Sequence, residues 1–434
     1  MSESLLAGLL DPATRPDPFP LYARIREAGP LPVPSRPAVV FAGHADCLAV
    51  LRSPGASSDR RNSIMVADRL AEMARRSPGA VLPFASPSFL FLDPPDHTRL
   101  RRLVSSAFTP HVISRLEPLL TALIDDLIDA AAERGSLDAL ADLAYPVPVG
   151  AICALLGVPE RDEPKIHTWS ELLARSLDPM IALTGEMDPD APVRMRAGGE
   201  LREYMRDLVR RRRREPGDDL LTGLIRASDG GGAQESRLSE EELISTCVLL
   251  LIAGHETTVN LIANGALALL RAPEQWAALA ADPSRGPRVV DETLRYDPPV
   301  HLVGRVARKE INVGGVTLTP GAFALLLIGG TGRDPLLTRD PDRFDPDRAE
   351  VRTLSFGMGP HFCVGAPLAR LEGRLVLSRL TQRVLGARLV DEQPRYKPNI
   401  SLRGVVSLPV HFDRIAPRST PWGGPAGHGG AARA

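Results

Sequence analysis

The sequence predicts a fold that is mainly α-helical with small β-sheets. Residues 116–135 and 197–219 have the three- to four-residue apolar spacing of amphipathic helices. Residues 311–330 differ, because β-branched side chains there stand between a Gly-Gly and a Pro-Gly turn, a pattern that favours short strands. A further pair of short strands is expected near residues 401–412. Helices should therefore dominate, and the sheets should be minor.

The composition narrows the class of protein. The chain has 434 residues, 44% of them hydrophobic, which is enough for a large core. A formal net charge of −1 gives no general attraction to nucleic acid. The apolar runs at 247–253 and 322–328 are far shorter than the roughly 18 residues of a membrane span, and the N-terminus lacks the basic region of a signal peptide. We expect a cytoplasmic protein that binds neither nucleic acid nor a membrane.

Three segments are expected along the chain. Residues 1–16 should be a flexible N-terminus, residues 17–415 a folded domain, and residues 416–434, which are rich in Gly, Pro and Ala, a disordered tail. Within the domain, residues 53–89 and 177–199 mix apolar residues with helix breakers. Segments of this kind are either lids and binding loops or plain surface connections.

One long helix is expected over residues 238–271. Ser239 and Glu242 have the spacing of a capping box at its start. Its apolar middle contains AGHETT at 253–258, where an acid and two threonines are unfavourable in a buried helix. The Thr257 hydroxyl can bond back to the carbonyl of Ala253. Polar residues in such a place indicate either a function or a polar contact with a neighbouring helix.

Cys363 stands out among four cysteines, none of which has the spacing of a disulfide framework or a zinc site. It lies in FGMGPHFCVG, residues 356–365, directly before an amphipathic helix with Pro367 in its first turn. Backbone N–H groups at a helix start stabilise a thiolate, and the glycines let a flat ligand approach the main chain. Taken alone, the loop fits a metal ligand, a structural cysteine or a nucleophile.

The full pattern of this loop resembles the haem-binding loop of the cytochrome P450 family. Its fixed positions are Phe356, Gly359, His361, Cys363 and Gly365. The resemblance implies that heme b (iron protoporphyrin IX) is the cofactor and that the Cys363 thiolate is the ligand of its iron. Phe356, Gly357 and Gly365 would line the cofactor.

AGHETT in turn resembles the oxygen-activation motif of the same family. The resemblance assigns Glu256 and Thr257 as the acid–alcohol pair that supports protonation of bound O₂. Ala253 and Gly254 are small, and they would leave room above the haem.

Further residues match family positions. Glu292 and Arg295 match a Glu-x-x-Arg motif with a structural role, whose third partner is expected to be Arg343, with Arg348 as the alternative. The haem propionates would be held by His97, Arg101, Arg305 and His361. One minor departure is Gly-Arg-Asp at 332–334, where the family usually has Asn-Arg-Asp.

The resemblance runs from about residue 17 to residue 412 and implies a single-domain cytochrome P450 fold, with haem between the long central helix and the helix after Cys363. It implies a monooxygenase like the soluble bacterial members, which hydroxylates or epoxidises a lipophilic organic substrate with O₂, typically in secondary-metabolite biosynthesis. The pocket walls would come from 53–89, 177–199, 250–255, 299–303 and 399–403.

Electrons would come from NAD(P)H through a separate ferredoxin reductase and ferredoxin. The ferredoxin would dock near Cys363, where positive charge is offered by Arg101, Arg102, Arg370 and Arg374. These arginines equally fit plain solvated helix charges.

Three alternatives stay open. A peroxide-driven haem peroxygenase would need no electron donor, but such relatives usually lack an acid–alcohol pair. A non-catalytic haem-binding or sensor protein would bind the cofactor without turnover. A haem-free protein would use Cys363 as a nucleophile.

Overall fold

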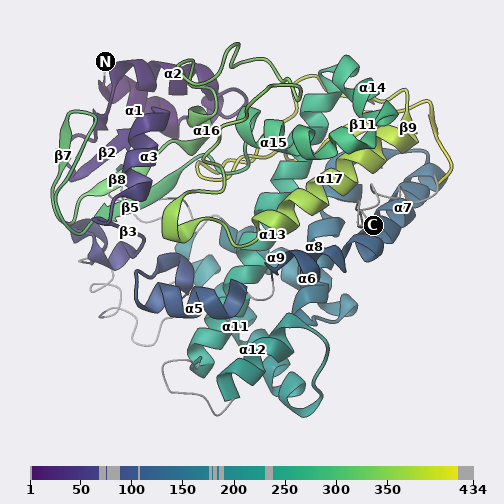
Figure 1. Ribbon diagram of the computed structural model, residues 1–434, viewed down its shortest axis with the longest axis horizontal. Coiled ribbons are helices and arrows are strands. Elements are labelled where there is room, and N and C mark those ends of the chain that lie inside the picture. Colours follow the sequence, from purple (N-terminus) through teal and green to yellow (C-terminus); the bar gives the residue numbers. More distant parts are fainter. Residues whose placement is uncertain are drawn as a thin grey trace, which may run out of the picture.

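The computed structural model describes residues 2–67, 75, 88–105, 108–174, 178, 183–184, 190–229 and 238–418. Helices make up most of the molecule, and the largest sheet lies at one side, next to the N-terminal helices (Figure 1). The predicted fold class, mainly α with small sheets, is confirmed.

Helix α13 (Glu240–Leu270) runs through the middle of the molecule (Figure 1). It begins with the predicted capping box, in which the Glu242 N–H donates to Ser239 Oγ at 3.2 Å and the Ser239 N–H donates to Glu242 Oε2 at 2.8 Å. It is buried on nearly all sides, because other helices pack around it, among them α8 (Pro146–Leu156), α9 (Glu163–Ala174), α11 (Ala191–Arg214), α15 (Gly286–Tyr296) and α17 (Ala366–Arg383).

Two stretches of the described chain, Ala139–Leu156 and Glu240–Leu270, are long and apolar enough to cross a membrane by length and composition alone. Their most apolar windows are, however, 67% and 78% buried inside the fold, as in the core helices of a globular protein.

Helix α17 follows the Cys363 loop and crosses α13 (Figure 1). The other helices surround this pair or cover the sheet: α1 (Ser2–Leu10), α2 (Phe19–Ala28), α3 (His44–Arg52), α5 (Asp96–Ser105), α6 (Pro110–Ser114), α7 (Glu117–Arg134), α12 (Leu220–Asp229), α14 (Pro273–Ala281) and α16 (Ile328–Thr331). The helix predicted over 116–135 is confirmed as α7, which ends at Gly135 in the left-handed conformation, φ 67°. The helix predicted over 197–219 is α11, which begins earlier, at Ala191, and ends at Arg214.

The largest sheet has five strands in the order β1-β2-β8-β5-β3: β1 (Leu31–Pro32), β2 (Ala38–Phe41), β8 (Phe323–Leu326), β5 (Val303–Ala307) and β3 (Ala56–Ser57). Only the β2–β8 pair in it is parallel. Both faces of the sheet are buried, since Val40 and Leu325 belong to one apolar cluster and Phe41 and Leu326 to another.

The short strands predicted over 311–330 are confirmed as β6 (Ile311–Val313), β7 (Val316–Leu318) and β8. The strand pair expected within 401–412 is not formed internally. There β11 (Pro409–His411) pairs with β10 (Arg388–Leu389) and β4 (Leu137–Asp138). The last small sheet joins β9 (Val384–Leu385) and β12 (Arg414–Ile415).

The chain ends differ from the prediction. The flexible segment expected over 1–16 instead contains helix α1, in which Leu5, Leu6 and Leu9 are buried. Their spacing places three leucines on one face, so burying that face against the rest of the fold fixes the segment. Of the tail expected over 416–434, residues 419–434 lie outside the described residues. Arg418, at the end of the described chain, pairs with Asp126 and Asp129 of α7.

Candidate functional site

The Cys363 loop folds back on itself directly before α17. The Cys363 N–H donates to the Phe356 carbonyl at 2.8 Å, and the Gly357 N–H donates to the Leu354 carbonyl at 2.7 Å. Gly357 and Gly359 have φ angles of 70° and 72°, a conformation that side chains with a Cβ rarely adopt. The predicted helix start is confirmed, because Gly365 caps α17 and Pro367 lies in its first turn.

Cys363 is the one exposed cysteine of the four, whereas Cys47, Cys153 and Cys247 are buried. The surrounding protein nevertheless desolvates the Cys363 thiol, which raises its pKa, while the N–H groups of Gly365 and Ala366 and the guanidinium of Arg101 act in the opposite direction. A thiol that is accessible and yet enclosed faces a space within the fold. N–H donors and cations beside it stabilise a thiolate, the form that binds iron.

Basic side chains gather beside this loop, as predicted. The rings of His97, on α5, and His361 lie 4.1 Å apart between centroids. Arg101 donates to the Phe362 carbonyl from the next turn of α5. Arg305, on β5, donates to the Gly304 carbonyl at 2.8 Å, and desolvation lowers its pKa to about 10.

This group fits the charged edge of a haem. Both ring nitrogens of His97 are buried and have no partner among the described residues. Arg101 and Arg305, together with His97, lower the pKa of His361 to about 3, after burial, which is the largest cause. The partnerless ring nitrogens of His97 and the desolvated guanidinium of Arg305 call for an acceptor, and two propionates would supply it.

On α13 the back-bond predicted for Thr257 is confirmed, because its Oγ1 donates to the Ala253 carbonyl at 2.8 Å. Thr258 makes the same kind of bond to the Gly254 carbonyl at 3.0 Å. A side chain at Gly254 would lie 3.7 Å from Ile152 Cδ1, so this position faces α8. Ala253 is half-buried.

The acid of the pair, Glu256, is 3% exposed. Its Oε1 accepts from Lys397 Nζ, and its Oε2 is buried without a partner among the described residues. Burial raises the pKa of Glu256, and the Lys397 ammonium opposes that rise.

Lys397 was not predicted as a site residue. It is distant from Glu256 in the sequence and lies in the segment between β10 and β11. One signal was available, since Lys397 is one of three lysines among 52 basic residues, and the rest are arginines.

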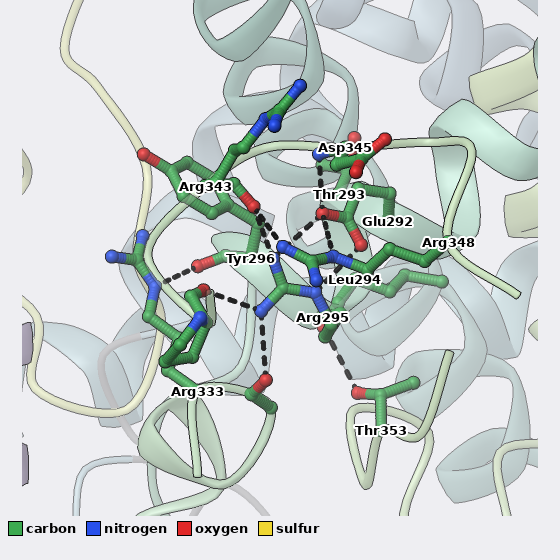
Figure 2. Close-up of polar contacts among 12 residues, drawn as sticks. Glu292, Thr293, Leu294, Arg295, Tyr296, Arg333, Arg343, Asp345, Arg348 and Thr353 are labelled. Carbon is green, nitrogen blue, oxygen red and sulfur yellow. Dashed lines mark hydrogen bonds and ion pairs between the residues drawn. The ribbon is translucent and has the colours of Figure 1, made fainter. Parts of the chain in front are cut away.

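The Glu-x-x-Arg prediction is correct in its pair, and its third member is the alternative, Arg348, and not the preferred Arg343 (Figure 2). Arg295 binds Glu292 through two bonds of 2.7 Å, and both side chains are fully buried. Arg348 Nε lies 3.2 Å from Glu292 Oε1, whereas Arg343 contributes its backbone carbonyl to Arg295 and points its exposed side chain away. A turn at 345–348 directs the Arg348 side chain inward. Because the Asp-Pro-Asp-Arg sequence occurs twice, the sequence alone does not predict which of the two arginines points inward.

Parts of the predicted pocket walls lie close together. The Asp178 carboxylate accepts from the Ile400 and Ser401 N–H groups at 3.2 and 2.8 Å, which joins the 177–199 segment to the turn at 399–403. The His301 N–H donates to the Ser401 carbonyl at 2.8 Å and joins 299–303 to the same turn. Residues 68–74, 76–87, 177, 179–182 and 185–189 of the two irregular segments lie outside the described residues.

Relatives and solved structures agree with this geometry. The family model for cytochrome P450 matches residues 66–282 and 287–409. The vitamin D(3) 25-hydroxylase of Pseudonocardia autotrophica is 37% identical over 93% of this chain and 95% of the relative. The cytochrome P450 monooxygenase PikC of Streptomyces venezuelae is 38% identical over 92% of both chains.

A crystal structure of Mycobacterium smegmatis CYP164A2 in the ligand-free state is 52% identical and superposes with a TM-score of 0.87, covering 94% of this chain and all of that one. The Cys363 loop, the acid–alcohol pair on α13 and the buried Glu292–Arg295 pair thus occur together in a chain that matches these proteins over nearly its full length. The protein is a haem-dependent monooxygenase that belongs to the cytochrome P450 family.

Proposed function

We propose that this enzyme hydroxylates or epoxidises a lipophilic organic molecule with O₂, using electrons from separate redox proteins. The observation that carries the proposal is that the chain combines an enclosed, accessible cysteine with a buried glutamate and a half-buried threonine on the central helix. Haem, when bound, supplies the iron that binds and activates O₂. The residues of the chain hold the cofactor, exclude water and deliver protons.

The Cys363 thiolate would hold the haem iron. The N–H groups of Gly365 and Ala366 are directed at the sulfur and stabilise its negative charge. His97, Arg101, Arg305 and His361 hold the propionates.

Glu256 and Thr257 supply the protons that O₂ activation requires. Thr257 Oγ1 both donates to the Ala253 carbonyl and has lone pairs free to accept, so it can hold a water or a proton donor in place. Glu256 is buried, and burial raises its pKa, which brings the carboxyl closer to the range in which it can take up and release a proton near neutral pH.

Electrons would arrive from NAD(P)H through a ferredoxin reductase and a ferredoxin. Of the four arginines suggested for docking, Arg370 pairs with Asp291 at 2.9 Å and Arg374 with Glu117 at 2.8 Å. These ion pairs partly offset the positive charge of Arg370 and Arg374, so both arginines attract an acidic partner less than the sequence suggests. Arg102 is exposed on α5, and it is the better candidate for a contact with an acidic partner.

The substrate class is a lipophilic molecule of secondary metabolism. The apolar side chains around 250–255 and the described relatives support this class: one relative is named a vitamin D(3) hydroxylase, and one related structure contains hexadec-9Z-enoic acid on an acyl carrier protein.

The proposal is tested with the haem-loaded enzyme, a surrogate ferredoxin pair and a substrate found by spin-state screening. The variant T257A should lower product formed per NAD(P)H consumed and raise peroxide release, and E256Q should lower the turnover rate by about 10²-fold, as for loss of a proton-transfer group. T258A is the matched control, because Thr258 makes the same back-bond one residue away. Full coupling in T257A, with equal product from hydrogen peroxide alone, would instead support the peroxygenase alternative.

A further inference from the structure

Lys397 contacts the buried carboxylate of Glu256 on α13 and also lines a polar pocket. Its Nζ donates to Glu256 Oε1 and lies 3.4 Å from Asn260 Oδ1, one helical turn further along α13. The Lys397 side chain is 16% exposed and that of Glu256 is 4% exposed. The ammonium therefore stands at the boundary between solvent and the buried carboxylate.

The backbone of the turn fixes Lys397 in this position. Its N–H donates to the Gly404 carbonyl at 2.9 Å. Gly404 approaches α13 so closely that a Cβ there would lie 2.0 Å from Asn260 Oδ1. Asn264 donates to the carbonyls of Asp297 and Arg403 at 3.1 and 3.2 Å, which binds the turn to the next stretch of α13.

Lys397 also lines a pocket on the outer side of this turn. Most of its lining residues are polar or aromatic, among them Arg15, Tyr22, His301, Tyr396, Lys397 and Asn399. Tyr22 and His301 meet there, with 3.0 Å between Oη and Nδ1. Such walls suit water better than an apolar substrate.

Buried polar atoms along this line are incompletely hydrogen-bonded: Glu256 Oε2 and Asn260 Nδ2 lack a hydrogen-bond partner among the described residues, and His301 Nε2 lies 3.7 Å from Asp297 Oδ1, too far for a hydrogen bond. Buried groups of this kind are nearly always hydrogen-bonded in folded proteins, often to ordered water. Water in the pocket and beside Lys397 would satisfy them.

We propose that protons enter this enzyme through the pocket lined by Arg15, Tyr22, Tyr396 and Asn399, and that Lys397 is the positioning residue that holds the Glu256 carboxylate at the inner end of the route. The proposal rests on the proposed function of Glu256 as a proton donor and adds the source of its protons.

The proton balance is simple. Glu256 gives one proton inward, towards Thr257, and the carboxylate that remains takes one proton from water on the pocket side. Lys397 takes no part in the transfer itself, and no electrons move in these steps. Its charge favours the carboxylate, so it ensures that Glu256 is turned towards the pocket between transfers.

Other charged groups face Glu256 as well. Glu171, on α9, is exposed and raises the pKa of Glu256 slightly further, whereas Lys397 lowers it. His167, on α9, and His255, next to Glu256 on α13, both have lowered pKa values and are neutral near pH 7. Lys397 is thus the nearest group whose removal should change the titration of Glu256.

The first test needs no turnover. Infrared difference spectra of the ferric, haem-loaded protein during a pH titration should show that the Glu256 carboxyl protonates at higher pH in K397M than in the unmodified protein. The band should be absent from E256Q/K397M. K397Q is a second variant in case K397M folds poorly, and K397R should leave the titration in place. Equal titration of Glu256 with and without Lys397 would overturn the proposal.

The second test follows coupled turnover. K397M should lower it by roughly tenfold, less than E256Q, because a positioning residue contributes less than the proton-transfer group itself. K397R should restore most of the rate, and K309M is the matched control, since Lys309 is exposed on the loop after β5. A loss in E256Q with full activity in K397M would overturn this inference and leave the proposed function standing. Full activity in both variants would contradict the proposed function itself.

Discussion

Glu292 and Arg295 form a two-point ion pair in which neither side chain has any exposed surface, with Nε–Oε2 and Nη2–Oε1 distances of 2.7 Å. The remaining N–H groups of Arg295 donate to the carbonyls of Gly332, Pro341 and Arg343 (Figure 2). The pair therefore ties α15 to two later loops. Since a buried charge without its partner is costly, its role is to hold these segments in one arrangement.

The two candidate arginines for the third position should behave differently. We expect R348A to lower the free energy of unfolding by about 1.5–3 kcal/mol, because it removes a charged hydrogen bond from buried Glu292. R343A should stay within about 0.5 kcal/mol, because only the backbone of Arg343 is used. Urea unfolding followed by circular dichroism measures both. Equal losses, or a larger loss in R343A, would show that the assignment of Arg348 is wrong.

Haem retention should depend on Arg305. The variant R305Q removes a desolvated cation whose described hydrogen bond is to the neighbouring carbonyl of Gly304. We expect haem to pass to apomyoglobin several-fold faster from R305Q than from the unmodified protein, because a charge-assisted bond to a propionate is lost. R102Q is the control, since Arg102 is exposed on α5. Equal transfer rates in R305Q and R102Q would remove Arg305 from the cofactor site.

Stability should fall on acidification because two histidines are buried in neutral form. Burial is the largest cause that lowers the pKa of His255 to about 3 and of His301 to about 4, from an ordinary value of 6.5. The unfolded chain binds these protons below pH 6.5, whereas the folded chain does not until far lower pH. The stabilisation is therefore complete above pH 6.5 and is lost towards pH 4, by up to about 1.4 kcal/mol per pH unit for each histidine.

The variant H255F removes one of the two histidines and so isolates the contribution of His255 to the pH dependence of stability. Its free energy of unfolding should depend less steeply on pH between pH 6 and pH 4.5, by up to about 1.4 kcal/mol per pH unit. Urea unfolding at a series of pH values measures the slope. Parallel curves for H255F and the unmodified protein would mean that His255 is protonated equally in both states.

Alanine substitution of two glycines should change the stability of the protein in opposite directions. A Cβ at Gly265, where α13 meets α17, would lie 2.8 Å from Leu377 Cδ1 and 3.2 Å from Thr293 Oγ1. We expect G265A to cost about 1–3 kcal/mol by overpacking. At Gly199, inside α11, a Cβ meets nothing within 4 Å, so G199A should stabilise the protein by about 0.5–1 kcal/mol. Thermal unfolding distinguishes the two, and a stabilised G265A would contradict the close crossing of α13 and α17.

Features that depend on neighbouring residues could be predicted from the sequence. The capping box of α13, the Thr257 back-bond and the glycine-rich loop before α17 are all set within a few residues. Helix α1 could have been predicted as well, since Leu5, Leu6 and Leu9 already have helical spacing. Its shortness made the segment resemble a flexible end.

Features that depend on distant residues could not be predicted. Two Asp-Pro-Asp-Arg sequences follow each other at 340–348, and only the folded turn decides which arginine reaches Glu292. The contact between Glu256 and Lys397 joins residues 141 positions apart, with no pattern that links them. Likewise the strand β11 pairs with segments near residues 137 and 388, not with its own neighbours.

The central claim is that Cys363 binds haem iron as a thiolate. The most direct measurement is the absorbance difference spectrum of the purified, dithionite-reduced protein with carbon monoxide. We expect a strongly red-shifted Soret band, which is lost in C363S. An unshifted band, as with a neutral ligand, would show that Cys363 is not the thiolate ligand, and a folded, haem-supplied protein without haem absorbance would contradict haem binding altogether.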